Sequence, residues 1–227
     1  MAPEDMPPEA LATAAAPWPR PKGLLLDAMG TLIGLRASVG STYAAAAARH
    51  GLSVEARRID QLFPAVLKAA PPLAFPELRG DDLAAAELAW WGDRIDAVLQ
   101  AAGAGPAPRP LQQELFELYA QPAQWRIYDD VARHLPRWRA QGLRLGIVSN
   151  FDGRLEGLLE GLGLAPLIDV VVVSSRCGAA KPSPAPFLRA LESLGLAAGE
   201  VWHVGDSPED AAGAGAAGLP CLLVRRP

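Results

Sequence analysis

Residues 23–31 read Gly-Leu-Leu-Leu-Asp-Ala-Met-Gly-Thr, a short apolar run that ends at an acidic residue, Asp27, and a glycine turn. The run between Gly23 and Leu26 contains no polar residue, so it lacks the alternation of a half-exposed strand. A strand that is apolar on both faces is typical of a parallel sheet that helices cover on both sides. This stretch therefore predicts a buried strand with a carboxylate at its carboxyl end.

Four further apolar runs of the same kind follow later in the chain. They are Leu143–Val148, Asp169–Val173, Val201–Val204 and Cys221–Val224. Helical patterns separate most of these runs, as the crossover connections of a parallel sheet require. The pattern predicts an α/β fold with a doubly wound, Rossmann-like parallel sheet.

The stretch between the first and second predicted strands is far longer than one crossover helix. Its helical patterns cover Val39–His50, Glu55–Ala69, Asp81–Ala102, Leu111–Ala120 and Asp130–Gln141. Only the last of these is needed to return the chain to the sheet. We therefore predict a core of residues 22–34 and 122–227, an inserted helical unit of residues 35–121, and a flexible, proline-rich lead-in of residues 1–21.

The composition excludes several classes of protein. The 227 residues carry a formal net charge of −4 at pH 7, so the basic surplus of a nucleic-acid-binding protein is missing. No uncharged stretch approaches the roughly 20 apolar residues that cross a bilayer, and the chain begins with acidic residues where a secretory signal is basic. Two cysteines are too few for a disulfide framework. We expect a cytoplasmic protein, monomeric or homodimeric, that binds neither nucleic acid nor membranes.

Polar side chains follow four of the predicted strands, at the edge where open parallel sheets bind ligands. In chain order they are Asp27 and Thr31, then Ser149 and Asn150, then Lys181, and finally Asp206 and Asp210. Carboxylates that converge on one point raise each other's pKa unless a cation lies between them. Because oxygen ligands favour a hard divalent ion, the pattern indicates a Mg²⁺ site.

The same residues suit phosphoryl transfer. A carboxylate such as Asp27 is able to attack phosphorus and form an aspartyl-phosphate, while Ser149 and Lys181 would hold the phosphoryl oxygens. Taken singly, Asp206 and Ser149 also fit as helix caps, so the prediction depends on the order of all these residues and on their placement at strand ends. His203, inside a predicted strand, is expected to be a core histidine rather than a ligand.

In this order the residues resemble the four motifs of the haloacid dehalogenase superfamily. Asp27–Thr31 is similar to its Asp-x-Asp-Gly-Thr motif, and Ile147–Asn150 is similar to its second strand end. Lys181 takes the place of its lysine, and Asp206 with Asp210 matches its Gly-Asp-x-x-x-Asp motif. The sequence around the second motif, together with a Trp-Trp pair in the insert, resembles one poorly characterised subgroup of the superfamily.

This resemblance spans about residues 22–224 and implies a hydrolase with a small phosphorylated substrate. It implies that the helical insert is a type-one cap, a lid that screens the site and selects the substrate. The catalytic residues it implies are Asp27, Ser149 and Lys181. The Mg²⁺ ligands are Asp27, Met29 through its backbone carbonyl, Asp206 and Asp210. The residues expected to bind substrate are Thr31, Ser149, Asn150 and Lys181.

Met29 departs from the family pattern, which has a second Asp there as general acid and base. Without this second Asp, the chain lacks a proton transfer that is worth about 10²–10⁴-fold in rate. Three hypotheses stay open: a phosphatase that is slow or limited to good leaving groups, a catalytically silent binding protein, and a haloacid dehalogenase-type hydrolase whose halide leaves without a proton. Arg36 and Arg79 in the insert are candidates for contact with a substrate anion.

Overall fold

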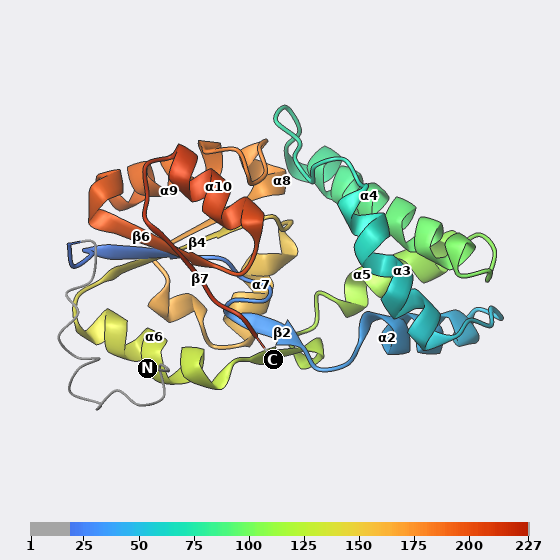
Figure 1. Cartoon of the computed structure of the whole chain (residues 1–227). Coiled ribbons are helices and arrows are strands. Elements are labelled where there is room, and N and C mark those ends of the chain that lie inside the picture. Colours follow the sequence, from blue (N-terminus) through green and yellow to red (C-terminus); the bar gives the residue numbers. More distant parts are fainter. Residues whose placement is uncertain (1–18, 227) are drawn as a thin grey trace, which may run out of the picture.

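The computed structural model describes residues 19–226 and places a parallel sheet at the centre of the larger part of the molecule (Figure 1). The sheet has five strands in the order β5-β4-β1-β6-β7, and every neighbouring pair is parallel. The strands are β1 Gly23–Leu26, β4 Arg144–Ser149, β5 Val170–Val173, β6 Val201–Gly205 and β7 Cys221–Leu223. The prediction of a doubly wound α/β sheet is confirmed.

Strand β1 lies at the point where the strand order reverses. It pairs with β4 on one side and with β6 on the other, so Leu25 lies opposite both Gly146 and His203. The later strands extend the sheet outward from these neighbours. The carboxyl ends of β1, β4 and β6 therefore meet at a single edge, which is where ligands bind in open sheets of this kind.

Helices cover both faces of the sheet, as the continuous apolar runs require. Leu24 and Leu26 of β1 pack with residues of α6 and α7, whereas Leu25 packs on the opposite face with residues of α9 and α10. These helices are α6 Asp129–Ala140, α7 Arg154–Gly161, α9 Ala185–Leu194 and α10 Pro208–Ala216. Shorter elements are η2 Pro122–Gln124, η3 Ala165–Leu167, α8 Ser174–Cys177 and η4 Ala198–Glu200.

The four helices between β2 and β3 form a separate layer beside the carboxyl edge of the sheet (Figure 1). They are α2 Val39–Arg49, α3 Ala56–Lys68, α4 Gly80–Ala101 and α5 Arg109–Leu118, each within two residues of its predicted limits. We call them the helical insert. They pack around their own apolar core, in which Tyr43, Ile59 and Leu111 are buried.

A two-stranded antiparallel sheet connects the helical insert to the rest of the chain. Strand β2 (Ile33–Leu35) leads into the insert and pairs with β3 (Trp125–Ile127), which leads out of it. No pattern in the sequence predicted this pair of short strands. Arg36, a candidate for anion binding, donates instead from Nε to the carbonyl of Trp125 at 2.8 Å, so it reinforces the connection. The exact limits of core and insert remain a prediction.

Three further predictions concern the N-terminal lead-in, membrane-spanning helices and the cysteines. Most of the predicted lead-in falls on residues 1–18, which lie outside the described residues, and Pro19 and Arg20 are exposed. Within residues 19–226, no helix combines the length and the apolar character needed to cross a membrane. Cys177 and Cys221 are both free thiols and half-buried.

Candidate active site

The loop after β1 approaches the loop after β6 very closely. The backbone N–H of Asp27 donates to the carbonyl of Val204 at 2.9 Å, which continues the β1–β6 pairing by one residue. At Gly30 the backbone has a φ of 87°, and a Cβ at this position would lie 2.2 Å from Oδ2 of Asp206. Glycine is therefore required both for the turn and for the contact.

Asp27 is held by two donors that come from different strand ends. Its Oδ1 accepts a hydrogen bond from Lys181 Nζ at 2.6 Å and another from Ser149 Oγ at 3.1 Å. Lys181 Nζ also donates to Asp210 Oδ1 at 2.6 Å and to the carbonyl of Val148 at 3.1 Å. These three acceptors match the three N–H groups of an ammonium ion, so the buried charge is fully paired.

Two residues expected to bind substrate make structural contacts. The side-chain amide of Asn150 donates to the carbonyl of Lys181 at 3.0 Å and accepts from its N–H at 2.7 Å, so it fixes the loop that carries the lysine. The buried hydroxyl of Thr31 lies 3.5 Å from Asp206 Oδ1 and outside the cleft. Asn150 is nonetheless exposed and lines the cleft, so its role in substrate binding stays a prediction, whereas Thr31 does not line the cleft.

Asp210 is buried and bonded through both oxygens. His203 Nε2 lies 2.8 Å from Oδ1, while Oδ2 accepts from the N–H of Ser207 at 3.1 Å and from its hydroxyl at 2.6 Å. Ser207 in turn caps α10 by accepting from the N–H of Asp210 at 3.2 Å. His203 is a buried residue as expected, but it also holds a carboxylate of the site, which the sequence did not indicate.

Three carboxylates meet at this edge of the sheet. One oxygen from each of Asp27, Asp206 and Asp210 lies within 4.8 Å of the others. Burial raises the pKa of Asp27, and the charge of Asp210 raises it further, against the opposing effect of Lys181. Burial and the charges of Asp27 and Asp210 likewise raise the pKa of Asp206. This excess of negative charge, with oxygen donors only, fits a hard divalent cation.

The pKa values of Asp210 and Lys181 both shift toward the charged form of the side chain. Burial opposes ionisation of Asp210, but the hydrogen bond from His203 and the charge of Lys181 outweigh it and hold the pKa of this carboxyl below its usual range. Burial also opposes the charge on Lys181, and its two carboxylate partners again outweigh it, so its pKa is raised. Asp210 and Lys181 are therefore both charged at neutral pH.

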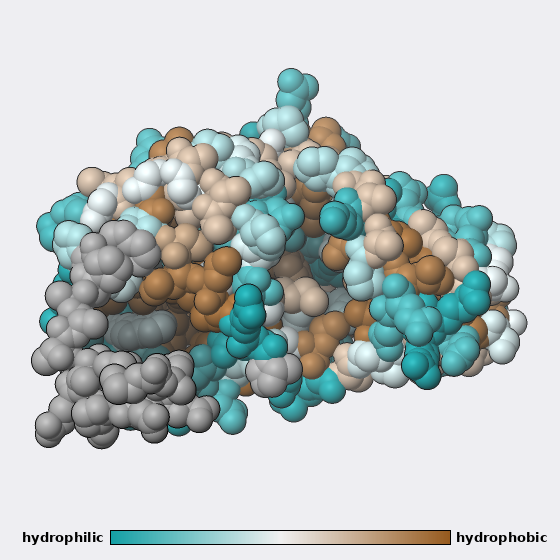
Figure 2. All heavy atoms as spheres, viewed as in Figure 1, coloured by the Kyte–Doolittle hydropathy of each residue, from teal (hydrophilic) through white to brown (hydrophobic). Residues whose placement is uncertain are grey.

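A cleft of about 500 Å³ lies between this edge and the helical insert, where Figure 2 shows the surface hollowed. Asp27, Lys181 and Asp206 line the sheet side of the cleft, and Trp90 and Trp91 line the opposite side. Among the residues described, Lys181 is the only Lys or Arg that lines it.

Two further candidates are placed differently. The side chain of Met29 is 45% exposed and reaches the cleft from the sheet side. Arg79 bonds to the nearby carbonyls of Pro76 and Leu78 and lines a separate groove, so it does not face the cleft.

Sequence reasoning missed a buried network that joins the insert to the loop after β4. The fully buried carboxylate of Asp152 accepts from Trp91 Nε1 at 2.7 Å and from Arg154 through Nε at 2.8 Å and Nη2 at 2.7 Å. Glu87 of α4 accepts from the N–H of Gly153 at 3.1 Å. The subgroup resemblance covered several of these residues, but it carried no information about their contacts.

Comparison with known proteins agrees with this geometry. Residues 21–218 match the family model described as haloacid dehalogenase-like hydrolase. Haloacid dehalogenase-like hydrolase domain-containing protein 3 of Bos taurus is 36% identical over 208 residues, which cover 90% of this chain and 82% of the relative. It represents the subgroup that the sequence resembles.

Two further proteins, one similar in sequence and one in fold, are named for different activities. Phosphoglycolate phosphatase of Rhodospirillum rubrum is 42% identical over 99 residues, 43% of this chain and 41% of the relative. The structure of L-2-haloacid dehalogenase from Xanthobacter autotrophicus shares the fold, with a TM-score of 0.63 and 23% identity over 89% of this chain and 77% of that one. The family match covers the whole site, and the chain belongs to the haloacid dehalogenase-like hydrolases.

Proposed function

We propose that this hydrolase is a Mg²⁺-dependent phosphatase that acts on small phosphorylated molecules through Asp27. The observation that carries the proposal is the geometry of this carboxylate, which Ser149 and Lys181 hold through one oxygen, Oδ1, beside two further carboxylates. The partial similarity to phosphoglycolate phosphatase supports the choice of a phosphate ester as substrate.

The proposed reaction has two steps. Oδ2 of Asp27, which neither Ser149 nor Lys181 contacts, attacks phosphorus; the bond to the leaving oxygen breaks, and an aspartyl-phosphate forms. Water then hydrolyses this intermediate, which restores the carboxylate and releases phosphate. The charge of Lys181 and the hydroxyl of Ser149 stabilise the phosphoryl oxygens in both steps.

Asp27 and Asp206 would hold the Mg²⁺ ion most directly. Asp210 would be the third carboxylate of the ligand set, since its oxygen lies within 4.8 Å of the other two, and it also holds Lys181 through a 2.6 Å hydrogen bond. The backbone carbonyl of Met29 completes the proposed ligand set. When bound, the ion supplies positive charge to the phosphoryl oxygens.

The side chain of Met29 limits the range of substrates. A thioether transfers no proton, so the leaving oxygen must depart with little protonation. The phosphatase is therefore either slow on ordinary alkyl phosphates or restricted to good leaving groups. In this proposal the helical insert serves as the cap over the cleft, and the protein acts in the cytoplasm.

The proposal is tested by phosphate release from p-nitrophenyl phosphate. We expect turnover with Mg²⁺ that disappears with EDTA and in Asp27→Asn. Asp93→Asn makes the same chemical change on α4, at a side chain that is 75% exposed and outside the cleft, and should keep full activity. Equal turnover in Asp27→Asn and the unchanged protein would remove Asp27 as nucleophile.

Met29 also favours two other functions, because neither of them needs an acid at this position. A haloacid dehalogenase-type hydrolase would release chloride from 2-chloropropionate without Mg²⁺. A silent binding protein would hydrolyse no ester of a broad panel, yet Mg²⁺ would raise its melting temperature. Measuring chloride and phosphate release beside the melting temperature separates the three functions.

A further inference from the structure

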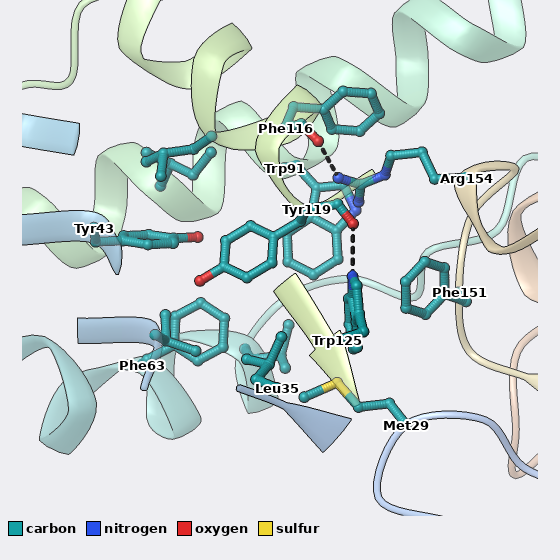
Figure 3. Close-up of a pocket in the computed structure, with 14 residues that line it drawn as sticks. Met29, Leu35, Tyr43, Phe63, Trp91, Phe116, Tyr119, Trp125, Phe151 and Arg154 are labelled. Atoms are coloured by element: carbon teal, nitrogen blue, oxygen red, sulfur yellow. Dashed lines mark hydrogen bonds between the residues drawn. The ribbon is translucent and has the colours of Figure 1, made fainter. Parts of the chain in front are cut away.

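A second cavity, of about 70 Å³, lies between the helical insert and the sheet. Its walls are almost entirely apolar or aromatic, and we call it the aromatic cavity (Figure 3). The rings come from both parts of the molecule: Tyr43, Phe63, Phe116, Tyr119, Trp125 and Phe151. The one charged group in the wall, Arg154, is already engaged by Asp152 and stacks 3.8 Å from the centre of the Phe116 ring.

The aromatic cavity adjoins the cleft that contains Asp27. Five side chains line both spaces: Met29, Leu35, Leu67, Trp91 and Phe151. Figure 3 shows the side chain of Met29 passing below Trp125 and extending toward Leu35. Met29 lines the aromatic cavity and, together with Asp27, the cleft, so the apolar space opens beside the reacting carboxylate's cleft.

The walls are preorganised for a flat apolar group. The ring centres of Tyr43 and Phe63 are 5.9 Å apart with an angle of 78° between the ring planes. Those of Tyr119 and Trp125 are 6.4 Å apart at 69°. In both pairs the edge of one ring faces the other ring, which is a favourable arrangement of aromatic side chains. The volume is about half that of an apolar cavity of 150 Å³ that binds benzene, so a ring would occupy the aromatic cavity together with the adjoining part of the cleft, and the apolar walls give water no partners. Burial of one ring at such a place strengthens binding by about tenfold or more.

We infer that the aromatic cavity is a subsite for the leaving group, and that the preferred substrates are phosphate monoesters of small phenols. The inference rests on the proposed function and names its substrate class. When Asp27 attacks, the bond between phosphorus and the aryl oxygen breaks, and the oxygen leaves with the electron pair as a phenolate. A phenolate is stable enough to leave without protonation, and Met29 is unable to supply a proton.

The first test is of binding alone, with phenylphosphonate and methylphosphonate as probes in the presence of Mg²⁺. We expect phenylphosphonate to bind about tenfold more tightly by calorimetry. Val39→Phe fills the aromatic cavity from α2 and should abolish this advantage. Val66→Phe adds the same ring on α3, at a half-buried valine that lines neither space, and should retain it. Equal affinities for the two probes in the unchanged protein would overturn the inference.

The second test compares phenyl phosphate with hexafluoroisopropyl phosphate, whose leaving alcohol has similar acidity but no ring. We expect a lower KM for phenyl phosphate, and Phe63→Ala should raise that value alone by about tenfold. This variant serves as the cavity test if Val39→Phe does not fold.

The outcomes separate the inference from the proposed function. Tighter binding of phenylphosphonate without hydrolysis of any ester would overturn the phosphatase and the leaving-group role, and would keep only the binding of an aromatic ring in the cavity. Turnover that is equal for both esters in all variants would keep the phosphatase and overturn the subsite.

Discussion

Trp91 and Asp152 meet across the boundary between the helical insert and the sheet, where the indole Nε1 donates a 2.7 Å hydrogen bond to a fully buried carboxylate. Arg154 donates hydrogen bonds to the same carboxylate from two side-chain nitrogens, and it also donates to the carbonyl of Phe116 at 2.7 Å. One buried charge pair therefore ties α4, α5 and the loop after β4 together. It also fixes the orientation of Trp91, which lines both the cleft and the aromatic cavity.

Asp152→Ala is expected to lower the free energy of unfolding by about 3–5 kcal/mol, because it leaves the Arg154 charge buried without a partner. Trp91→Phe removes one hydrogen bond and should cost only about 1–2 kcal/mol. Urea denaturation measures both. If the double variant Asp152→Ala/Arg154→Ala is no more stable than Asp152→Ala alone, an unpaired charge is not the cause.

Met29→Asp is expected to restore proton transfer to the leaving group. The rate of hydrolysis of an alkyl phosphate should rise, by up to about 10²–10⁴-fold, while that of p-nitrophenyl phosphate changes little. The measurement is kcat/KM on both esters. Met29→Asn is the matched control, since it has the same shape and no acidic proton, and an equal gain in this variant would show that polarity alone accounts for the change.

Lys181→Met is expected to reduce kcat by about 10²–10³-fold, the usual cost of removing one group that stabilises charge on the reacting oxygens. Lys181→Arg should not restore activity, because the buried site matches three acceptors around one nitrogen. Lys22→Met removes an exposed lysine that pairs with Glu200 and serves as the control. Retained kcat in Lys181→Met would mean that the lysine is only structural.

Asp169 gives a prediction for the pH dependence of stability. Burial opposes its charge, but the N–H of Leu145 and the guanidinium groups of Arg139 and Arg144 outweigh burial and lower the pKa of this carboxyl. A lowered folded-state pKa stabilises the protein above the unfolded pKa of about 4, and this contribution is lost as pH falls through the folded pKa.

Accordingly, the stability difference between the unchanged protein and Asp169→Asn should be largest near neutral pH and should shrink below about pH 4. Urea unfolding at a series of pH values measures it. The exposed substitution Asp93→Asn should show no such trend. A difference that stays constant down to low pH would contradict the ionic origin of the effect.

The sheet and the charged edge were predictable from the sequence for a local reason. The inner strands β1 and β4 are buried on both faces, so each appears as a continuous apolar run, and the residue that follows the run is placed at the edge by topology alone. Asp27, Ser149 and Asp206 were found in this way. The helices of the insert were equally visible, since each buries an apolar stripe against its neighbours.

The rest depends on contacts between segments far apart in the chain. Strands β2 and β3 are three residues long, and each forms only because the other lies opposite. The burial of Asp152 depends on Trp91 and Arg154, whose proximity no local pattern encodes. Asn150 followed the right strand, but only the course of the loop before Lys181 decides that its amide bonds to backbone.

The pairing of β2 with β3 has an evolutionary consequence. Since the chain leaves the sheet domain and returns to it through adjacent, hydrogen-bonded strands, residues between Leu35 and Trp125 begin and end at one point in space. An insert whose two ends are paired in this way tolerates changes in length and sequence while its ends stay in place. Changes within the helical insert therefore need not move the carboxylates and the lysine at the edge of the sheet.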